Sequence, residues 1–216
     1  MKKFKLTSEF IVDISGVKLF RIKALIEFGN VKAGDLGGYI EKEENLSHMG
    51  NAWVSGNAQV SGDARVSGNA RVSGDARVSG NAWVSGDAQV FGNAQVSGDA
   101  RVFGNAWGFG DARVSGNARV SGDAQVFGDA RVSGNAQVFG DARVSGDKDY
   151  AYAHGFGSCN RTTTFFRLKD GDVGVRCGCF YGTLAQFRDN VCETHGETKN
   201  PPVARQGLPW PHRPAP

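Results

Sequence analysis

Between residues 50 and 145 the chain repeats one pattern of hydrophobic and polar positions every six residues. Sixteen consecutive hexads, such as GNAQVS and GDARVS, follow one another without an insertion. Each contains glycine, asparagine or aspartate, alanine, a variable residue, usually valine, and then serine or phenylalanine. A fixed period of this length predicts a solenoid, and hexapeptide repeats indicate a parallel β-helix.

Strand alternation assigns a direction to each position of the hexad. The valines and alanines should point inward, and the arginine, glutamine or tryptophan between them should point outward. Glycine followed by asparagine or aspartate should form the corners, where positive φ angles and bonds from side chain to backbone are useful. The hexads therefore predict a prism with an apolar interior and a polar surface.

The segment before the hexads lacks their strict period. Residues 1–49 predict a few short strands, although the run VKLFRIKALIEF also fits a helix. Ile40 and Leu46 are six residues apart like the later valines, whereas Leu46 and Val54 are eight apart. We interpret 1–49 as N-terminal strands and a degenerate coil that caps the solenoid, because solenoid ends need atypical coils.

The period decays again after the last hexad, so we place the β-helix at 50–151. Residues 152–196 predict a β-β-α module, because 162–177 alternate like a hairpin with its turn at 169–172. Thr183 fits the N-cap of a following helix with an apolar face. Residues 197–216 are rich in proline and have no periodicity, which predicts a disordered tail.

The hexads resemble those of hexapeptide-repeat proteins, as in VSGDAR. In that family three hexads form one triangular coil of about eighteen residues. The resemblance implies an all-β solenoid, a left-handed parallel β-helix of about five to six coils, followed here by the small β-β-α module. The stretches GDLGGYIE and CGCFYGTL further resemble the N-terminal and C-terminal parts of transferase-type hexapeptide proteins of phages and prophages.

An eighteen-residue coil brings distant residues into columns. Asparagine and aspartate alternate up most corners, as in Asn57 below Asp75, so that an amide can donate to the neighbouring carboxylate. Duplication of a twelve-residue unit would produce the same alternation. Gly108 replaces the inward valine of one hexad, and either a rotated neighbouring aromatic ring or a small cavity should result.

Aromatic residues also gather in these columns and form the candidate binding surface. Exposed apolar patches usually mark contact sites, and contact with the terminal segments is the alternative. The candidate binding residues are Phe91, Phe109 and Phe127 on one corner, Trp53 and Trp107 on one face, and Trp83 on another.

Charge and hydropathy exclude several partners. The repeat carries eight arginines and eight aspartates, and the whole chain has a net charge of +3. Without a basic stripe we expect no nucleic-acid partner. No apolar run is long enough for a signal peptide or a membrane span, so we expect a cytoplasmic protein with no membrane partner.

Two kinds of chemistry have candidate residues. His154 is the candidate general base of an acyltransferase, which would use coenzyme A, but the hexads contain no histidine and extrude no loop. Cys159, Cys177, Cys179 and Cys192 are candidate metal ligands, yet their spacing matches no zinc pattern. Buried reduced cysteines are the simpler interpretation, and we expect no metal or cofactor.

These observations favour a non-enzymatic structural or binding protein of phage or prophage origin. It should act through its β-helix faces in a homo-oligomer, and the hexapeptide family favours a trimer. One alternative is an acyltransferase-like enzyme. A second alternative is a phage factor that binds a host protein or a small metabolite, and small anions are further candidate ligands for the outward arginines.

Overall fold

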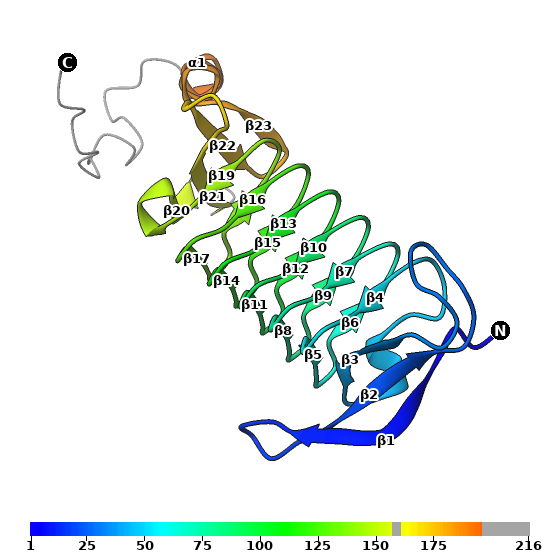
Figure 1. Cartoon of the computed structure of the whole chain (residues 1–216). Coiled ribbons are helices and arrows are strands. Elements are labelled where there is room, and N and C mark those ends of the chain that lie inside the picture. The colour runs from blue at the N-terminus through cyan, green and yellow to red at the C-terminus, as the bar shows by residue number, and fades with distance from the viewer. Residues whose placement is uncertain (157–160, 196–216) are drawn as a thin grey trace, which may run out of the picture.

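The computed structural model describes residues 1–156 and 161–195, and these residues form a rod (Figure 1). The body of the rod is a β-solenoid of about six turns with parallel sheets. An N-terminal hairpin lies at one end, and a small antiparallel sheet with one helix lies at the other. The predicted tail at 197–216 lies outside the described residues.

Within residues 50–145 each hexad contributes one two-residue strand to one of three parallel faces. Face 1 consists of β4 (Trp53–Val54), β7 (Arg71–Val72), β10 (Gln89–Val90), β13 (Trp107–Gly108), β16 (Gln125–Val126) and β19 (Arg143–Val144). Face 2 consists of β5 (Gln59–Val60), β8 (Arg77–Val78), β11 (Gln95–Val96), β14 (Arg113–Val114) and β17 (Arg131–Val132). Face 3 consists of β6 (Arg65–Val66), β9 (Trp83–Val84), β12 (Arg101–Val102), β15 (Arg119–Val120) and β18 (Gln137–Val138).

The core of the solenoid is the stack of inward valines and alanines. Each strand pairs with the strand eighteen residues later, so that Val60 lies beside Val78 and Val78 beside Val96. The valines and alanines of the hexads are at most 3% exposed. The predicted parallel solenoid with an eighteen-residue coil is therefore confirmed, because valine and alanine alternate with outward residues along each short strand.

The corners carry the predicted amide ladder. Asn57 donates from Nδ2 to Asp75 Oδ1 at 3.1 Å, and Asn93 donates to Asp111 at 2.9 Å in the same column. The other two columns repeat this arrangement between successive coils. Where the alternation holds, it separates the carboxylates and provides each of Asp75, Asp87, Asp99, Asp111 and Asp123 with a donor from the coil below.

Gly108 leaves open space inside the solenoid. It pairs with Val90 on one side and Val126 on the other. A Cβ atom at Gly108 would meet no heavy atom within 4 Å beyond its chain neighbours. Neither neighbouring ring fills this space, because Trp107 is exposed and Phe109 stacks between two phenylalanines on the corner. Of the two alternatives, a rotated ring or a small cavity, the structure therefore contains the small cavity.

The N-terminal segment extends face 2 beyond the first complete coil. β1 (Phe4–Val12) and β2 (Lys18–Ala24) form an antiparallel hairpin, and β3 (Leu36–Ile40) joins β2 to β5. The second apolar run is thus a strand, not a helix. A short 3₁₀ helix, η1 (Glu43–Asn45), follows β3.

A degenerate coil connects this hairpin to the hexads. Ile40 pairs with Val60, and Leu46 forms a bridge with Val66. Both separations are twenty residues instead of eighteen, because the chain carries two extra residues before the first hexad. The buried side chains of Ile40 and Leu46 continue the valine columns toward this end.

Backbone polarity makes the two ends of the solenoid chemically different. The outward residue of each strand donates its N–H to the following coil, as from Trp53 to the carbonyl of Ala70, whereas parallel pairing directs the valine N–H to the preceding coil. The glycine, alanine and valine carbonyls of the first coil therefore face the N-terminal end and need donors. Lys3 Nζ donates to Ala52 at 2.8 Å and to Gly50 at 3.3 Å.

Further carbonyls of the first coil receive donors from the degenerate coil. Asn45 Nδ2 donates to the carbonyl oxygens of Ala64 at 2.8 Å and Gly62 at 3.0 Å. The backbone of β3 supplies face 2 through the N–H of Tyr39, which donates to Ala58. Lys3 and Asn45 are both buried, so their polar atoms act as caps of the solenoid.

At the opposite end, backbone N–H groups of the last coil need acceptors. Asp147, in the 3₁₀ helix η2 (Asp147–Asp149), accepts from Arg131 N at 3.1 Å. Asp149 accepts from the backbone and hydroxyl of Ser145. Burial raises the pKa of Asp149, but these hydrogen bonds and Arg167 outweigh burial and hold that pKa below its usual value.

The C-terminal module has more strands than the sequence predicted. The predicted hairpin is present as β21 (Arg161–Arg167) and β22 (Val173–Cys177), but β20 (Tyr150–Phe156) and β23 (Phe180–Thr183) flank it. The predicted hairpin and helix are thus present, and two further antiparallel strands complete a four-stranded sheet. The sequence did not predict β20 because this strand begins only a few residues after the last hexad, where the six-residue period is already irregular.

The helix of this module, α1 (Leu184–His195), begins where it was predicted. Thr183 Oγ1 accepts a hydrogen bond from Gln186 N at 3.3 Å, and Gln186 Oε1 accepts from Thr183 N at 2.9 Å. This reciprocal pair satisfies two backbone donors at the helix start. In the part of the chain that the structure describes, no helix is both long and apolar enough to cross a membrane.

Candidate functional site

The phenylalanines of one solenoid corner form a continuous stack. The ring centroids of Phe91 and Phe109 are 5.2 Å apart with planes inclined by 5°, and Phe109 and Phe127 are 5.1 Å apart with a 6° inclination. The eighteen-residue spacing predicted this arrangement. All three side chains are half-buried, so each presents part of its ring to solvent.

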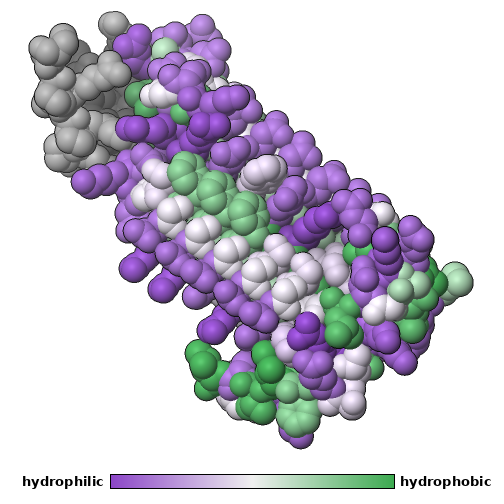
Figure 2. All heavy atoms as spheres, in the orientation of Figure 1, coloured by the Kyte–Doolittle hydropathy of each residue, from purple (hydrophilic) through white to green (hydrophobic). Residues whose placement is uncertain are grey.

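This corner borders face 1, where further aromatic side chains are exposed. Trp107 is 39% exposed and contacts Phe91 edge to face at 6.2 Å. Phe103 is 38% exposed and lies at the corner between face 3 and face 1, on the opposite edge of face 1. We call the set Phe91, Phe103, Trp107, Phe109 and Phe127 the aromatic face. Figure 2 shows a hydrophobic band along the solenoid with polar side chains beside it.

The aromatic face is uncharged at its centre. The outward residues above and below Trp107 are Gln89 and Gln125. The equivalent positions on the other two faces carry arginine in most coils, as at Arg113 and Arg119. Face 1 is therefore the side of the solenoid on which an apolar partner meets the least charge in these coils.

Trp53 does not belong to the exposed surface. Its side chain is only 7% exposed and contacts Phe28 edge to face at 5.4 Å. The segment between β2 and β3 covers the first strand of face 1, and Lys3 Nζ lies 4.6 Å from the Phe28 ring centroid. The prediction of Trp53 as a surface binding residue is corrected, since the N-terminal segment uses this ring as a packing contact.

Trp83 lies on face 3, away from the aromatic face. It is 43% exposed, its Nε1 donates to Ser67 Oγ at 3.3 Å, and the Arg101 guanidinium lies 5.8 Å from its ring centroid. These contacts hold the indole against its own face. Trp83 is thus an isolated aromatic residue among arginines, and it suits a control substitution.

The candidate base His154 lies at the end of an amide chain. Asn117 Nδ2 donates to Asn135 Oδ1 at 3.0 Å, and Asn135 Nδ2 lies 3.1 Å from His154 Nε2. His154 Nδ1 lies 2.7 Å from Thr162 Oγ1. With the amide as donor, Nε2 accepts, so in the neutral ring Nδ1 carries the proton and donates to Thr162. Both ring nitrogens are therefore engaged by protein atoms.

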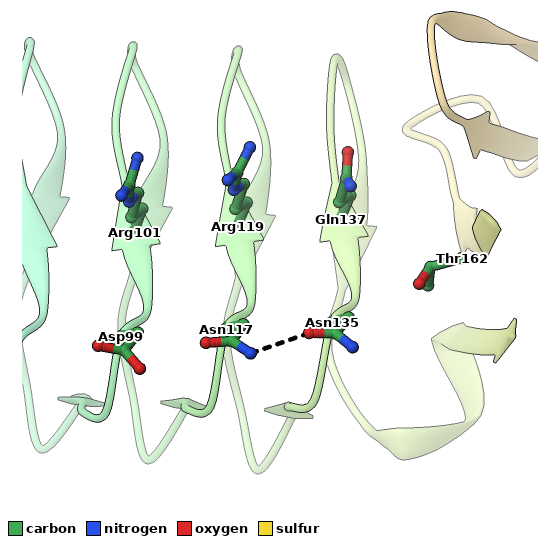
Figure 3. A pocket seen from close by; sticks show the side chains of 7 residues that line it. All are labelled: Asp99, Arg101, Asn117, Arg119, Asn135, Gln137 and Thr162. Atoms are coloured by element: carbon green, nitrogen blue, oxygen red, sulfur yellow. Dashed lines mark hydrogen bonds between the residues drawn. The ribbon is translucent and has the colours of Figure 1, made fainter. Parts of the chain in front are cut away.

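A polar groove of about 400 Å³ lies beside this chain, between face 3 and β21. Arg101, Arg119 and Gln137 project in one row, and a second row follows the corner below them (Figure 3). Thr162 stands beyond the last coil, at the end of the groove. The groove is lined by Asp99, Arg101, Asn117, Arg119, Asn135, Gln137 and Thr162.

The candidate metal ligands are not assembled into a site. Cys177 is half-buried and accepts a hydrogen bond from Thr163 Oγ1 at 3.0 Å, whereas Cys179 and Cys192 are exposed free thiols. Cys159 lies outside the described residues. Within residues 1–156 and 161–195, no three histidine, cysteine, aspartate or glutamate side chains gather where they could hold a metal.

The regular coil, its uninterrupted hexads and its corner glycines allow a comparison with known repeats. The hexads are similar to the YdcK beta solenoid repeat. The matches cover residues 58–74, 70–86, 94–107, 112–126 and 124–138. No curated protein matches the chain. The similarity to the YdcK beta solenoid repeat supports a repeat β-helix protein and lies entirely within the three-faced body.

The groove was only partly foreseen from the sequence. The eighteen-residue coil already places Arg101, Arg119 and Gln137 in one column. Nothing periodic signals that Thr162 lies at the end of the groove and that His154 contacts it, because both residues belong to the C-terminal sheet. The run of three threonines at residues 162–164, in the first strand of the predicted hairpin, was the available hint.

Proposed function

We propose that the protein is a non-enzymatic structural and binding protein that assembles into a homotrimer through its aromatic face. The observation that carries this proposal is the stack of Phe91, Phe109 and Phe127 on an otherwise polar prism. Most other hexads carry serine at this position. Exposed apolar patches of this kind are typical of protein contacts.

Charge favours a second copy of the chain as the occupant. Around a symmetry axis a residue meets its own copies, so a charged row would repel itself. Faces 2 and 3 carry neighbouring arginines, such as Arg113 beside Arg131. The aromatic face has neutral glutamines around Trp107, so this repulsion is smaller there than on the other two faces.

The geometry of the stack suits a threefold axis parallel to the solenoid. The phenylalanines repeat once per coil along a straight corner. Three such corners in register would bring three rings together in each layer, and Trp107 would contact the neighbouring subunit. The resemblance to hexapeptide-repeat proteins, in which trimers are the habit, agrees with this arrangement.

The proposed trimer determines the molecular mass that the protein should have in solution. The wild-type protein should have a mass near three times the 23.0 kDa of one chain in light scattering. Replacing Phe91, Phe109 and Phe127 together with serine should reduce the mass to that of one chain. Serine already occupies this position in most hexads, so the fold should be retained.

Trp83→Gln is the matched control for this experiment. It removes an exposed aromatic side chain from face 3, and glutamine is found at the same position of other hexads. The control should leave the trimer intact. A monomeric wild type, or a triple variant that keeps the wild-type mass, would refute assembly through the aromatic face.

The acyltransferase alternative makes a different prediction. It requires that coenzyme A raise the melting temperature and that His154→Ala abolish this shift. In the structure His154 Nε2 already accepts from Asn135, so a general base at this nitrogen would have to break that bond. A non-enzymatic protein should show no His154-dependent shift.

A further inference from the structure

We propose that the groove between face 3 and β21 binds a small oxyanion of the phosphate class, with Arg101 and Arg119 as its principal ligands. The site lies on a different face from the aromatic face. It is independent of the proposed trimer, because the groove is formed within one chain.

Two neighbouring positive charges border the groove, and one of them, Arg101, also faces the Trp83 ring at 5.8 Å. Arg101 and Arg119 are direct partners in neighbouring parallel strands. Such strands lie about 4.8 Å apart, and like charges at this separation destabilise a sheet. Among the ion pairs within residues 1–156 and 161–195, none includes either arginine. A multivalent anion between the two guanidinium groups would convert repulsion into charge-assisted hydrogen bonds.

The carboxylate that lines the groove belongs to Asp99 and takes part in the amide ladder. Asp99 accepts from Asn81 Nδ2 at 2.9 Å, so the amide ladder draws its carboxylate toward the coil below. The next two residues of this corner column are Asn117 and Asn135, where alternation would have required an aspartate. This interruption leaves the part of the groove nearest Arg119 without a carboxylate.

Thr162 and Gln137 supply further hydrogen-bond donors to the groove. The Asn117 and Asn135 amides are committed to the chain that ends at His154. Because neutral His154 donates to Thr162 Oγ1, the Thr162 hydroxyl hydrogen is free to point into the groove. Gln137 lies next to Arg119 in the same column and adds an amide donor. His154 is thus a positioning residue for Thr162.

Face 2 provides an internal comparison. Arg113 and Arg131 are also direct partners in neighbouring strands. They do not line the groove beside β21. If two stacked arginines were enough, both pairs would bind anions equally, whereas a built site requires the wall with Thr162.

The test is a titration with phosphate at constant ionic strength. Binding of inorganic phosphate and of glycerol phosphate is measured by calorimetry for the wild type and for the double variant Arg101→Gln/Arg119→Gln. We expect saturable binding by the wild type and a loss of at least about tenfold in affinity in the double variant, because each charge-assisted bond contributes that much. Tighter binding of glycerol phosphate would indicate an esterified ligand, and tighter binding of inorganic phosphate a free one.

Two further variants make the result specific. Arg113→Gln/Arg131→Gln removes the same charge from face 2 and should retain wild-type affinity. Thr162→Val should weaken binding while leaving both arginines in place. Glutamine is natural at these positions of the hexads, as at Gln95, so circular dichroism should show an intact fold. Equal losses in the two double variants, or no saturable binding by the wild type, would overturn the proposal.

Discussion

At the scale of single residues, the hexads contain glycines with two different roles. Gly110 lies at a corner with φ of +70°, and a Cβ there would approach the backbone N of Gly128 to 3.1 Å. Gly108 lies in β13 with its φ outside the left-handed region and with open space where a side chain would be. The first glycine is required by the backbone, whereas the second leaves the core incomplete.

This difference predicts opposite effects of one substitution. Gly108→Val should raise the free energy of unfolding by about 1–3 kcal/mol, because it buries a valine and removes a flexible glycine from a strand. Gly110→Val should lower it, because β-branched residues are strained at positive φ. Urea denaturation of both variants measures the two changes. A Gly108→Val protein no more stable than the wild type would mean that the cavity cannot accept the side chain.

Neighbouring segments determine whether a corner phenylalanine stays exposed, as in the stack of Phe91, Phe109 and Phe127. Phe139 also follows a β-strand at a corner, but it contacts Tyr181 edge to face at 5.1 Å. The C-terminal sheet therefore covers Phe139 and leaves the three-residue stack open. Burial, together with the charge of Asp141, raises the pKa of the Tyr181 hydroxyl. The mass measurement on the triple serine variant tests the residues that stay exposed.

At the scale of elements, the N-terminal cap depends on a buried lysine. Lys3 is 1% exposed, and burial lowers its pKa from 10.5 to about 8. Its Nζ provides the donors for the Gly50 and Ala52 carbonyls at the open edge of face 1. Since a neutral amine retains two N–H groups, the cap can persist after deprotonation.

This pKa predicts a rise in stability in alkaline solution. Between about pH 8 and 10.5 the unfolded chain holds the Lys3 proton and the folded chain does not, so the free energy of unfolding increases with pH. The gain should be on the order of 1–3 kcal/mol. Thermal melts at pH 7.5 and pH 10 measure it.

Lys3→Met is the matched variant for the alkaline measurement. It should lose this rise while tyrosines and other lysines titrate as in the wild type. It should also be less stable at neutral pH, because two buried carbonyls lose their donor. If the difference between wild type and variant did not change with pH, Lys3 would not be the responsible group.

At the scale of the whole molecule, the two ends of the rod are complementary and separately covered. At the N-terminal end, Lys3 and Asn45 donate hydrogen bonds to backbone carbonyls. At the C-terminal end, Asp147, Asp149 and Thr164 accept hydrogen bonds from backbone N–H groups. Uncapped, one end would pair with the other end of a second copy. Unprotected sheet edges of this kind are templates for assembly.

Removing both caps should therefore produce fibres. A chain limited to residues 50–145 should polymerise head to tail, because a donor edge then meets an acceptor edge. Truncation at one end alone should not, because two identical ends would place mostly carbonyls against carbonyls, or mostly N–H groups against N–H groups. Electron microscopy and light scattering of the three truncated chains distinguish these outcomes. Equal polymerisation of a singly truncated chain would contradict edge complementarity.

Local periodicity was enough to predict the body of the protein. The inward valines, the eighteen-residue columns, the amide ladder and the phenylalanine stack follow from a short repeat, because each contact joins residues at one constant separation. The extra two residues between Leu46 and Val54 likewise indicated where the register changes. The Thr183 cap of α1 was predictable because capping depends on residues three positions apart.

Contacts between the ends and the body depended on the tertiary structure. Phe28 buries Trp53, Tyr181 covers Phe139, and Thr162 lies at the end of the groove beside Arg119. The two residues of each pair have no constant separation along the chain, so no sequence pattern predicts these contacts. They arise because the terminal sheets must cover the open edges of the solenoid. Those sheets determine which columns of the repeat remain exposed as surface.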